Sequence, residues 1–190
     1  MDIILERIRI FADHAHADQK RKYTPERYIV HPVRVMKTCR RYEQQLPVLA
    51  AALLHDVLED TPVRADELLI FLQQVMDDSA ARETLSLVEE LTDVFVKAAF
   101  PRLNRRQRKE RELQRIIETS PDAQTIKYAD IIDNSSEIAS HDPDFAPRYL
   151  RECLTILENA NKGDRELHRI ALETVKDKLK ETKKNRDLPH

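Results

Sequence analysis

Residues 47–61 read PVLAAALLHDVLEDT, and they bring an apolar run directly against a cluster of ionisable groups. The run LAAALL predicts a buried helix, because a helix that is apolar all round has no face suited to water. The six positions that follow hold one imidazole and three carboxylates, from His55, Asp56, Glu59 and Asp60. Carboxylates beside a core need a partner, and a divalent cation is the partner that this mixture of groups indicates.

The spacing of these four residues predicts that their side chains lie together. Residues four apart share a face of a helix, so we expect His55 over Glu59 and Asp56 over Asp60. The two rows are adjacent, and all four groups could therefore point into one cleft. His55 and Asp56 offer one nitrogen and one oxygen ligand, and a metal site would need a further His and Asp from elsewhere in the chain.

Two residues are candidates to complete this site. His31 precedes Pro32, a residue suited to the first turn of a helix. Asp130 lies within IKYADIIDN, whose apolar stripe predicts a largely buried helix, so its carboxylate also needs a partner. Taken alone, an ion pair with Lys127 would satisfy Asp130 equally well. Asn134 lies one turn further along and could orient a ligand or a substrate.

Composition predicts the fold class. A single glycine in 190 residues argues against hairpin turns and glycine-rich phosphate loops, and neither GxGxxG nor GxxxxGK[ST] occurs. Apolar residues instead recur at helical spacing between corners that contain Pro, Asp or Asn. We expect an all-α fold, with eight to ten helices bundled around a metal cleft in one domain over 1–190. Its core would cover about 5–160, followed by a C-terminal helix and frayed tail at 164–190.

The expected helices can be placed by their apolar stripes. Gly163 follows one of them at a position that suits a left-handed helix cap, and the chain after residue 180 is expected to fray. The predicted helical segments are 2–17, 29–45, 47–60, 64–76, 81–100, 102–118, 122–141, 144–163 and 164–180.

Charge and cysteine content limit the partners. The net charge is −2, from 32 basic and 34 acidic residues, so no global field favours nucleic acid or a membrane. No long apolar span or signal peptide is visible. Cys39 and Cys153 form no CxxC pattern, and we interpret them as small buried residues in a reducing compartment. The sequence therefore predicts a cytoplasmic protein, and it leaves the oligomeric state open.

Three motifs in order resemble a known family. HADQKRKYTPERYIVHPVRV, AALLHDVLEDT and IKYADIIDN resemble the HD superfamily of phosphohydrolases. Within it they resemble the (p)ppGpp hydrolase branch, which contains the Rel/Spo-type hydrolase domains and the small alarmone hydrolases. The resemblance covers roughly residues 5–160. A lone His-Asp dipeptide would be weak evidence, whereas three motifs in this order are specific.

The resemblance implies an activity, which is removal of the 3′-pyrophosphate from guanosine tetra- or pentaphosphate to leave GDP or GTP. It implies one divalent metal ion, with Mn²⁺ the usual metal and Zn²⁺, Co²⁺, Fe²⁺ or Mg²⁺ as alternatives. The residues that match the family's site are the metal ligands His31, His55, Asp56 and Asp130, the acidic pair Glu59 and Asp60 that handles the water and the proton, and the substrate contacts Arg21, Lys22 and Asn134.

Departures from the family pattern leave other readings open. Asp18 replaces the family's usual glycine, and residues 89–111 look more like a stand-alone subgroup. Another phosphorylated nucleotide, such as NADPH losing its 2′-phosphate or a nucleoside monophosphate, would use the same metal set. A non-catalytic nucleotide-binding module is a further alternative. The basic run at 102–111 is a solvated face, a patch that meets substrate phosphates, for which Arg105 is the candidate, or a nucleic-acid contact.

Overall fold

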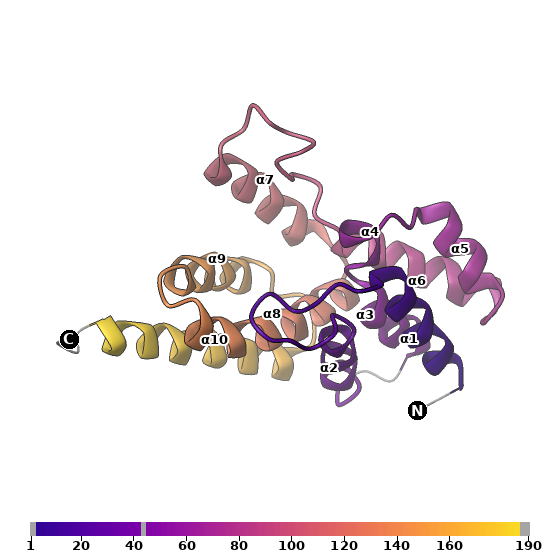
Figure 1. Cartoon of the computed structure of the whole chain (residues 1–190), viewed down its shortest axis with the longest axis horizontal. Coiled ribbons are helices and arrows are strands. Elements are labelled where there is room, and N and C mark those ends of the chain that lie inside the picture. The colour runs from indigo at the N-terminus through magenta and orange to yellow at the C-terminus, as the bar shows by residue number, and fades with distance from the viewer. Residues whose placement is uncertain (1–2, 43–44, 187–190) are drawn as a thin grey trace. The chain divides into compact units, whose positions relative to one another are not determined.

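Every regular element that the structure describes is helical (Figure 1). The structure is a computed structural model that describes residues 3–42 and 45–186, with side chains up to Lys183. Over these residues it contains ten helical segments and one isolated bridge pair, Lys20 with Arg27. The all-α prediction is confirmed. The chain divides into two compact units, Met1–Val94 and Phe95–His190.

The first unit is built around its most apolar helix. All residues from Pro47 to Leu54 of that helix, α3, are buried, as the run LAAALL predicted. Helices α1, α2 and α6 pack against α3, while α5 packs on α6 and the single turn α4 lies against α1. The helices of this unit are α1 (Ile3–His16), α2 (Val30–Cys39), α3 (Leu46–Leu54), α4 (Val57–Asp60), α5 (Ala65–Gln73) and α6 (Asp78–Leu91).

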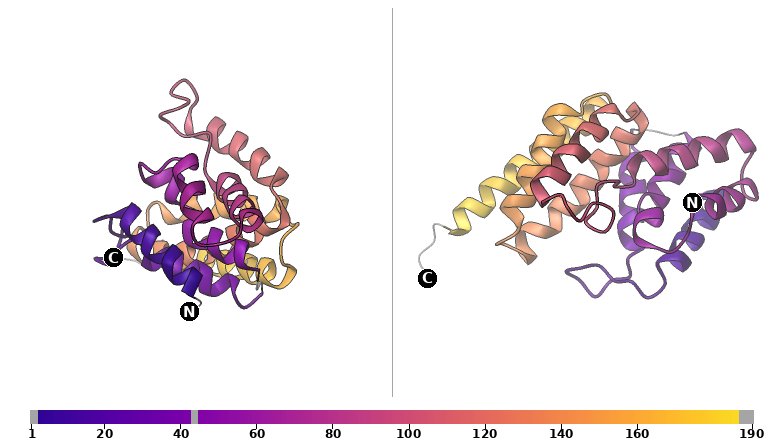
Figure 2. Two further views of the ribbon diagram at one scale, coloured as in Figure 1. Left: turned by 90° about the vertical axis from the view of Figure 1, so that its right-hand side faces the viewer. Right: turned by 90° about the horizontal axis from the view of Figure 1, so that it is seen from above.

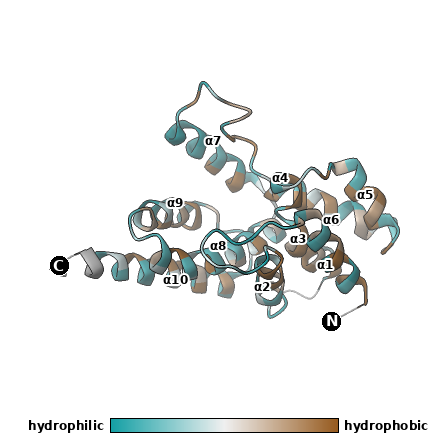
Figure 3. Cartoon of the chain, viewed as in Figure 1, coloured by the Kyte–Doolittle hydropathy of each residue, from teal (hydrophilic) through white to brown (hydrophobic). Residues whose placement is uncertain are grey.

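The second unit has α8 at its centre. Helix α8 packs against α9 and α10, and α9 also contacts α7 and α10. Figures 1 and 2 show the ribbons of α8, α9 and α10 close together. Figure 3 shows that α7 is mostly hydrophilic. None of the described helices combines the length and the hydropathy needed to cross a lipid bilayer. The helices of this unit are α7 (Arg105–Glu118), α8 (Pro121–His141), α9 (Ala146–Asn159) and α10 (Arg165–Arg186).

The predicted helix over 81–100 ends earlier than expected. Helix α6 stops at Leu91, and residues 92–104 form turns. Thr92 is extended, and its hydroxyl donates to the carbonyl of Val88 at 2.8 Å. The amide of Asp93 donates to the carboxylate of Glu59 at 3.1 Å rather than continuing the helix. Side-chain hydrogen bonds, one donated by Thr92 and one accepted by Glu59, thus replace the helical pattern here, which no periodicity in the sequence reveals.

The predicted left-handed cap at Gly163 is also wrong. Helix α9 ends at Asn159, and the φ angle of Gly163 is not positive. A Cβ atom on Gly163 would lie 2.7 Å from the ring of Tyr128 and 2.8 Å from the amide nitrogen of Thr125. Glycine is therefore present because the chain passes very close to α8, and not because the backbone is left-handed.

The C-terminal helix is longer than predicted. Fraying was expected after residue 180, yet α10 continues to Arg186. Lys178 pairs with Glu181 at 2.8 Å, and the buried Thr182 donates to the carbonyl of Leu179 at 2.9 Å. These contacts hold one more turn than the polar sequence suggested. The rest of the predicted tail, 187–190, lies outside the described residues.

Both cysteines are buried and unbridged, as predicted. Burial raises the pKa of the Cys153 thiol to about 12. Because the thiolate is the reactive species, we expect neither cysteine to react readily with Ellman's reagent in the folded protein. Both should react after denaturation in guanidinium chloride, which serves as the internal control. Rapid reaction of the native protein would contradict this prediction.

Candidate metal centre

The His-Asp dipeptide lies at a break between two helices. Helix α3 ends at Leu54, His55 and Asp56 form a turn, and α4 begins at Val57. The prediction of one continuous helix through 47–60 is therefore wrong at these two positions. The His55 ring bonds the carbonyl of Ala52 at 2.9 Å, the group that would accept the Asp56 amide in an uninterrupted helix. Asp56 has φ −98° and ψ −4°, a sparsely populated region in which many active-site residues are found.

His31 reaches the same place from another helix. It is the second residue of α2, which packs against α3, and its side chain is only 1% exposed. Its ring meets the ring of His55 edge-on, with the centroids 5.1 Å apart. Nε2 of His55 lies 3.0 Å from Oδ2 of Asp56, and Nε2 of His31 lies 3.6 Å from the same oxygen. One ligand atom from each of the three residues falls within 4.8 Å of the others.

These donors fit a divalent metal ion. A carbonyl oxygen only accepts hydrogen bonds, so the bond to Ala52 places the proton of the neutral His55 ring on Nδ1. Nε2 then carries the lone pair that a metal requires, and the bond on the far side fixes the direction of the ring. Two imidazoles and one carboxylate suit Mn²⁺, Zn²⁺, Co²⁺ or Fe²⁺. A set of three donors is also the usual protein share of a catalytic site, because it leaves positions for water or substrate.

The two predicted acidic residues lie on α4, immediately after the dipeptide, and both are exposed. Oε2 of Glu59 accepts a hydrogen bond from the amide of Asp93 at 3.1 Å. Oδ2 of Asp60 faces the side-chain amide of Gln19 at 3.4 Å. Each carboxylate therefore has a contact with a segment distant in the sequence, which limits its orientation.

The predicted basic pair lies in the turn between α1 and α2. The guanidinium of Arg21 lies over the ring of Tyr28, 5.9 Å from its centroid. Lys22 is exposed and donates to the hydroxyl of Tyr23 at 2.8 Å. The hydroxyl of Tyr28 in turn donates to Oδ2 of Asp56 at 2.7 Å. Tyr28 is not among the site residues that the sequence predicted, and its bond to a candidate ligand appears only in the structure.

The fourth expected ligand, Asp130, lies on α8 in the second unit and is 6% exposed. Its Oδ1 accepts a hydrogen bond from Asn134 at 2.6 Å, as the spacing of one helical turn suggested. Its Oδ2 forms an ion pair with Lys127 at 2.9 Å. This is the ion pair that the sequence suggested as an alternative to metal binding. Both contacts lie within one helix, and together they hold this buried carboxylate in place.

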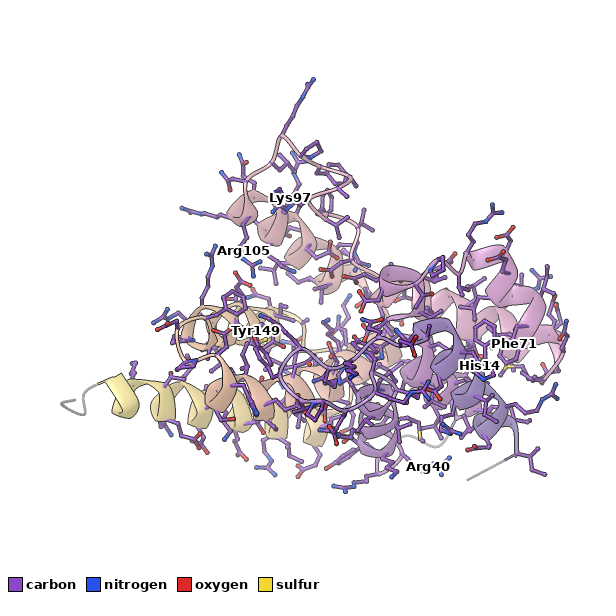
Figure 4. The ribbon with its side chains drawn as sticks, viewed as in Figure 1. His14, Arg40, Phe71, Lys97, Arg105 and Tyr149 are labelled. Atoms are coloured by element: carbon purple, nitrogen blue, oxygen red, sulfur yellow. The ribbon has the colours of Figure 1, made fainter. Side chains whose placement is uncertain are left out.

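The basic segment at 102–111 includes Arg105, the first residue of α7, which is labelled in Figure 4. Arg105 binds Glu152 of α9 through Nε at 3.1 Å and Nη2 at 2.6 Å, and it lies over the ring of Phe145. Arg108 donates to the carbonyl of Leu103. Between α7 and α9 a pocket of about 600 Å³ is lined by Arg106, Lys109, Glu110, Leu113, Arg148, Glu152, Thr155 and Ile156.

Comparison of the sequence with protein-family models assigns the chain to a family. The model of the HD domain matches residues 28–135, more than half of the chain. The chain belongs to the HD domain family. The matched stretch includes His31, His55, Asp56 and Asp130, so every candidate ligand lies inside the HD domain.

Relatives of this HD domain include (p)ppGpp hydrolases, which confirms the resemblance seen in the motifs. A mouse guanosine-3′,5′-bis(diphosphate) 3′-pyrophosphohydrolase, MESH1, is 37% identical over 133 residues, covering 67% of this chain and 65% of the relative. The Escherichia coli bifunctional (p)ppGpp synthase/hydrolase SpoT is 30% identical over 183 residues, covering 93% of this chain and 23% of the relative. The chain thus spans less than two thirds of the length of either relative.

Solved structures share the fold of this HD domain. A metazoan orthologue of SpoT, described as hydrolysing ppGpp, superposes with a TM-score of 0.70 at 23% identity, covering 100% of this chain and 98% of that chain. The protein lmo0812 from Listeria monocytogenes gives a TM-score of 0.58 at 20% identity, covering 79% and 99% of the two chains. At these identities the likeness establishes the fold alone.

Proposed function

We propose that this chain is a metal-dependent phosphohydrolase that removes the 3′-pyrophosphate from ppGpp and pppGpp. The convergence of His31, His55 and Asp56 on one point carries the proposal, because two imidazoles and a carboxylate are a donor set suited to a divalent metal ion. Relatives named as guanosine-3′,5′-bis(diphosphate) 3′-pyrophosphohydrolases support the choice of substrate. In this proposal the two units act together as one HD-type domain.

The proposed metal is Mn²⁺, held by His31, His55, Asp56 and Asp130. Asp130 contributes a buried carboxylate whose orientation is set by Asn134 and Lys127. When bound, the ion would neutralise phosphate charge and make a water molecule acidic near neutral pH. The three donors of the first unit come from two segments of the chain, and burial of both histidines shields them from solvent.

The acidic pair on α4 would handle the proton. The hydrogen bond from Asp93 holds the carboxylate of Glu59, so this group can accept the proton of the attacking water at a defined position. Asp60, tied to Gln19, would assist in the same transfer. Water would add to the phosphorus attached to the 3′ oxygen, and the bond between that phosphorus and the 3′ oxygen would break. GDP or GTP is then the leaving group, whose 3′ oxygen takes up the proton that the acidic pair removed from the water, and the pyrophosphate keeps the oxygen of that water.

The charged substrate requires cations to bind it. Arg21 and Lys22 would contact the base and the phosphates from the turn before α2, and Asn134 would contact the sugar-phosphate side. Arg105 is a weaker candidate, because Glu152 already neutralises its guanidinium through two hydrogen bonds. A role for Arg105 would require that ion pair to open when substrate binds.

The substrate assignment can be tested directly. Incubation of the Mn²⁺-loaded protein with ppGpp should release one pyrophosphate per GDP, measured by ion-exchange chromatography. Treatment with EDTA should abolish release, and added Mn²⁺ should restore it, because the activated water depends on the metal. A parallel assay with NADPH and nucleoside monophosphates serves as the control. Orthophosphate release from one of these, without turnover of ppGpp, would replace the substrate and retain the enzyme class.

A result without turnover would also be informative. Stoichiometric binding of ppGpp with no product under Mn²⁺, Zn²⁺, Co²⁺, Fe²⁺ or Mg²⁺ would contradict hydrolysis and indicate a nucleotide-binding module. Failure to bind any of these ions would contradict the metal centre itself.

A further inference from the structure

Tyr28 occupies a central place beside the candidate metal centre. It ends the turn that joins α1 to α2, three residues before His31. Its ring lies 4.4 Å from the ring of His16 and 6.0 Å, edge-on, from the ring of His31. The guanidinium of Arg21 lies over the same ring. One side chain therefore contacts a helix, a candidate ligand and a candidate substrate residue.

The hydroxyl of Tyr28 is directed at a ligand oxygen. It donates to Oδ2 of Asp56 at 2.7 Å, a length typical of a strong hydrogen bond to an ionised carboxylate. This is the same oxygen that both histidines approach. A carboxylate oxygen has lone pairs for more than one contact, so the phenol can hold Oδ2 without excluding a metal ion.

Tyr28 is held at its backbone by hydrogen bonds and at its ring by packing, so its hydroxyl has a defined position. The amide of Tyr28 donates to the carbonyl of Gln19 at 3.0 Å, and its carbonyl accepts from the amide of His31 at 3.0 Å. His16, which packs on the ring, is only 4% exposed, and its Nδ1 bonds the side chain of Gln19 at 2.9 Å. A donor fixed in this way can select one rotamer of a short side chain such as Asp56.

We propose that Tyr28 is a positioning residue of the metal centre, whose hydroxyl holds the Asp56 carboxylate in the orientation that binds the ion. The inference rests on the metal-binding part of the proposed function. It assigns to Tyr28 the role that hydrogen-bond partners of ligands have in metal sites, where their removal weakens metal binding or activity about 10- to 100-fold.

The test compares two tyrosines of the same turn. Tyr28→Phe removes the hydroxyl and keeps the ring that packs on His16. Tyr23→Phe is the matched control, because Tyr23 lies in the same turn and its hydroxyl accepts a hydrogen bond from Lys22. Mn²⁺ affinity, measured by isothermal titration calorimetry on the metal-free proteins, should fall about 10- to 100-fold in Tyr28→Phe and stay at the wild-type value in Tyr23→Phe.

The thermal midpoint in EDTA separates positioning from folding. We expect a midpoint close to that of the wild type for Tyr28→Phe, with a smaller rise on adding Mn²⁺. Wild-type affinity in Tyr28→Phe would overturn the inference and leave the proposed function intact. A variant that is unstable or unfolded without metal would assign the hydroxyl to the fold and also overturn it. If the wild type itself binds no Mn²⁺, the proposed metal centre fails, which is a distinct result.

Discussion

Replacing Asp56 with alanine should abolish both Mn²⁺ binding and pyrophosphate release. Asp56 supplies the only carboxylate of the three-residue cluster in the first unit, and its Oδ2 is the atom that both histidines face. Without it, two imidazoles remain, and the ion loses the anionic ligand that offsets its charge. A metal contributes several kcal/mol to such a reaction, so its loss should lower the rate by at least about 10³-fold.

Two variants make this prediction specific. Asp66→Ala removes an exposed aspartate of the same unit that pairs with Arg64, and it should leave metal binding and turnover unchanged. Glu59→Gln should retain Mn²⁺ but lose most turnover, because a neutral amide cannot accept the proton. Metal content by mass spectrometry and pyrophosphate release are the two readouts. An Asp56→Ala protein that keeps both would disprove the assigned site.

Gly163→Ala should destabilise the fold strongly, although it adds only one methyl group. That group would lie 2.8 Å from the amide nitrogen and hydroxyl of Thr125 and 2.7 Å from the ring of Tyr128. The same turn is held to α8 by bonds from Asp164 to Thr125 at 2.9 Å and from Tyr128 to the carbonyl of Ala160 at 2.8 Å. Relieving the clash would pull these bonds apart.

We expect a loss of about 3 kcal/mol, at the upper end for overpacking, since backbone as well as side chain must move. For a chain of this size that corresponds to a fall of roughly 6–12 °C in the thermal midpoint. Asn161→Ala, in the same turn but exposed, is the matched control and should change the midpoint little. A Gly163→Ala midpoint equal to that of the wild type would show that the turn can shift freely.

At the candidate site, local sequence patterns predicted the helices but not the distances between their side chains. The apolar run before His55 predicted the buried helix α3, and the position of His31 before Pro32 predicted a helix start, which the structure has at Val30. Neither pattern predicts the distance between His31 and Asp56, because that distance depends on how α2 packs against α3. The bond from His55 to Ala52, which accompanies the break in the helix, is likewise a matter of three-dimensional geometry.

Tyr28 and Gly163 illustrate the same limit in different ways. Tyr28 carried no distinctive signal, because a tyrosine beside a basic stretch is compatible with a core, a pocket wall or a ligand support. Gly163 carried a misleading one, since a glycine after a helix usually marks a left-handed cap. Its actual role is steric, and it follows from the close passage of the turn over Tyr128 and Thr125.

The amino-acid sequence alone determined that this chain is all-α, which side chains are candidate ligands of a divalent ion, and which family it resembles. These properties follow from composition, helical periodicity and the order of motifs, all of which are local. Tertiary structure alone decided that His31 meets His55 and Asp56, that the Tyr28 hydroxyl bonds Asp56, and that the chain at Gly163 passes very close to α8. These depend on packing between segments distant in the chain, where tenths of an ångström separate a contact from a clash.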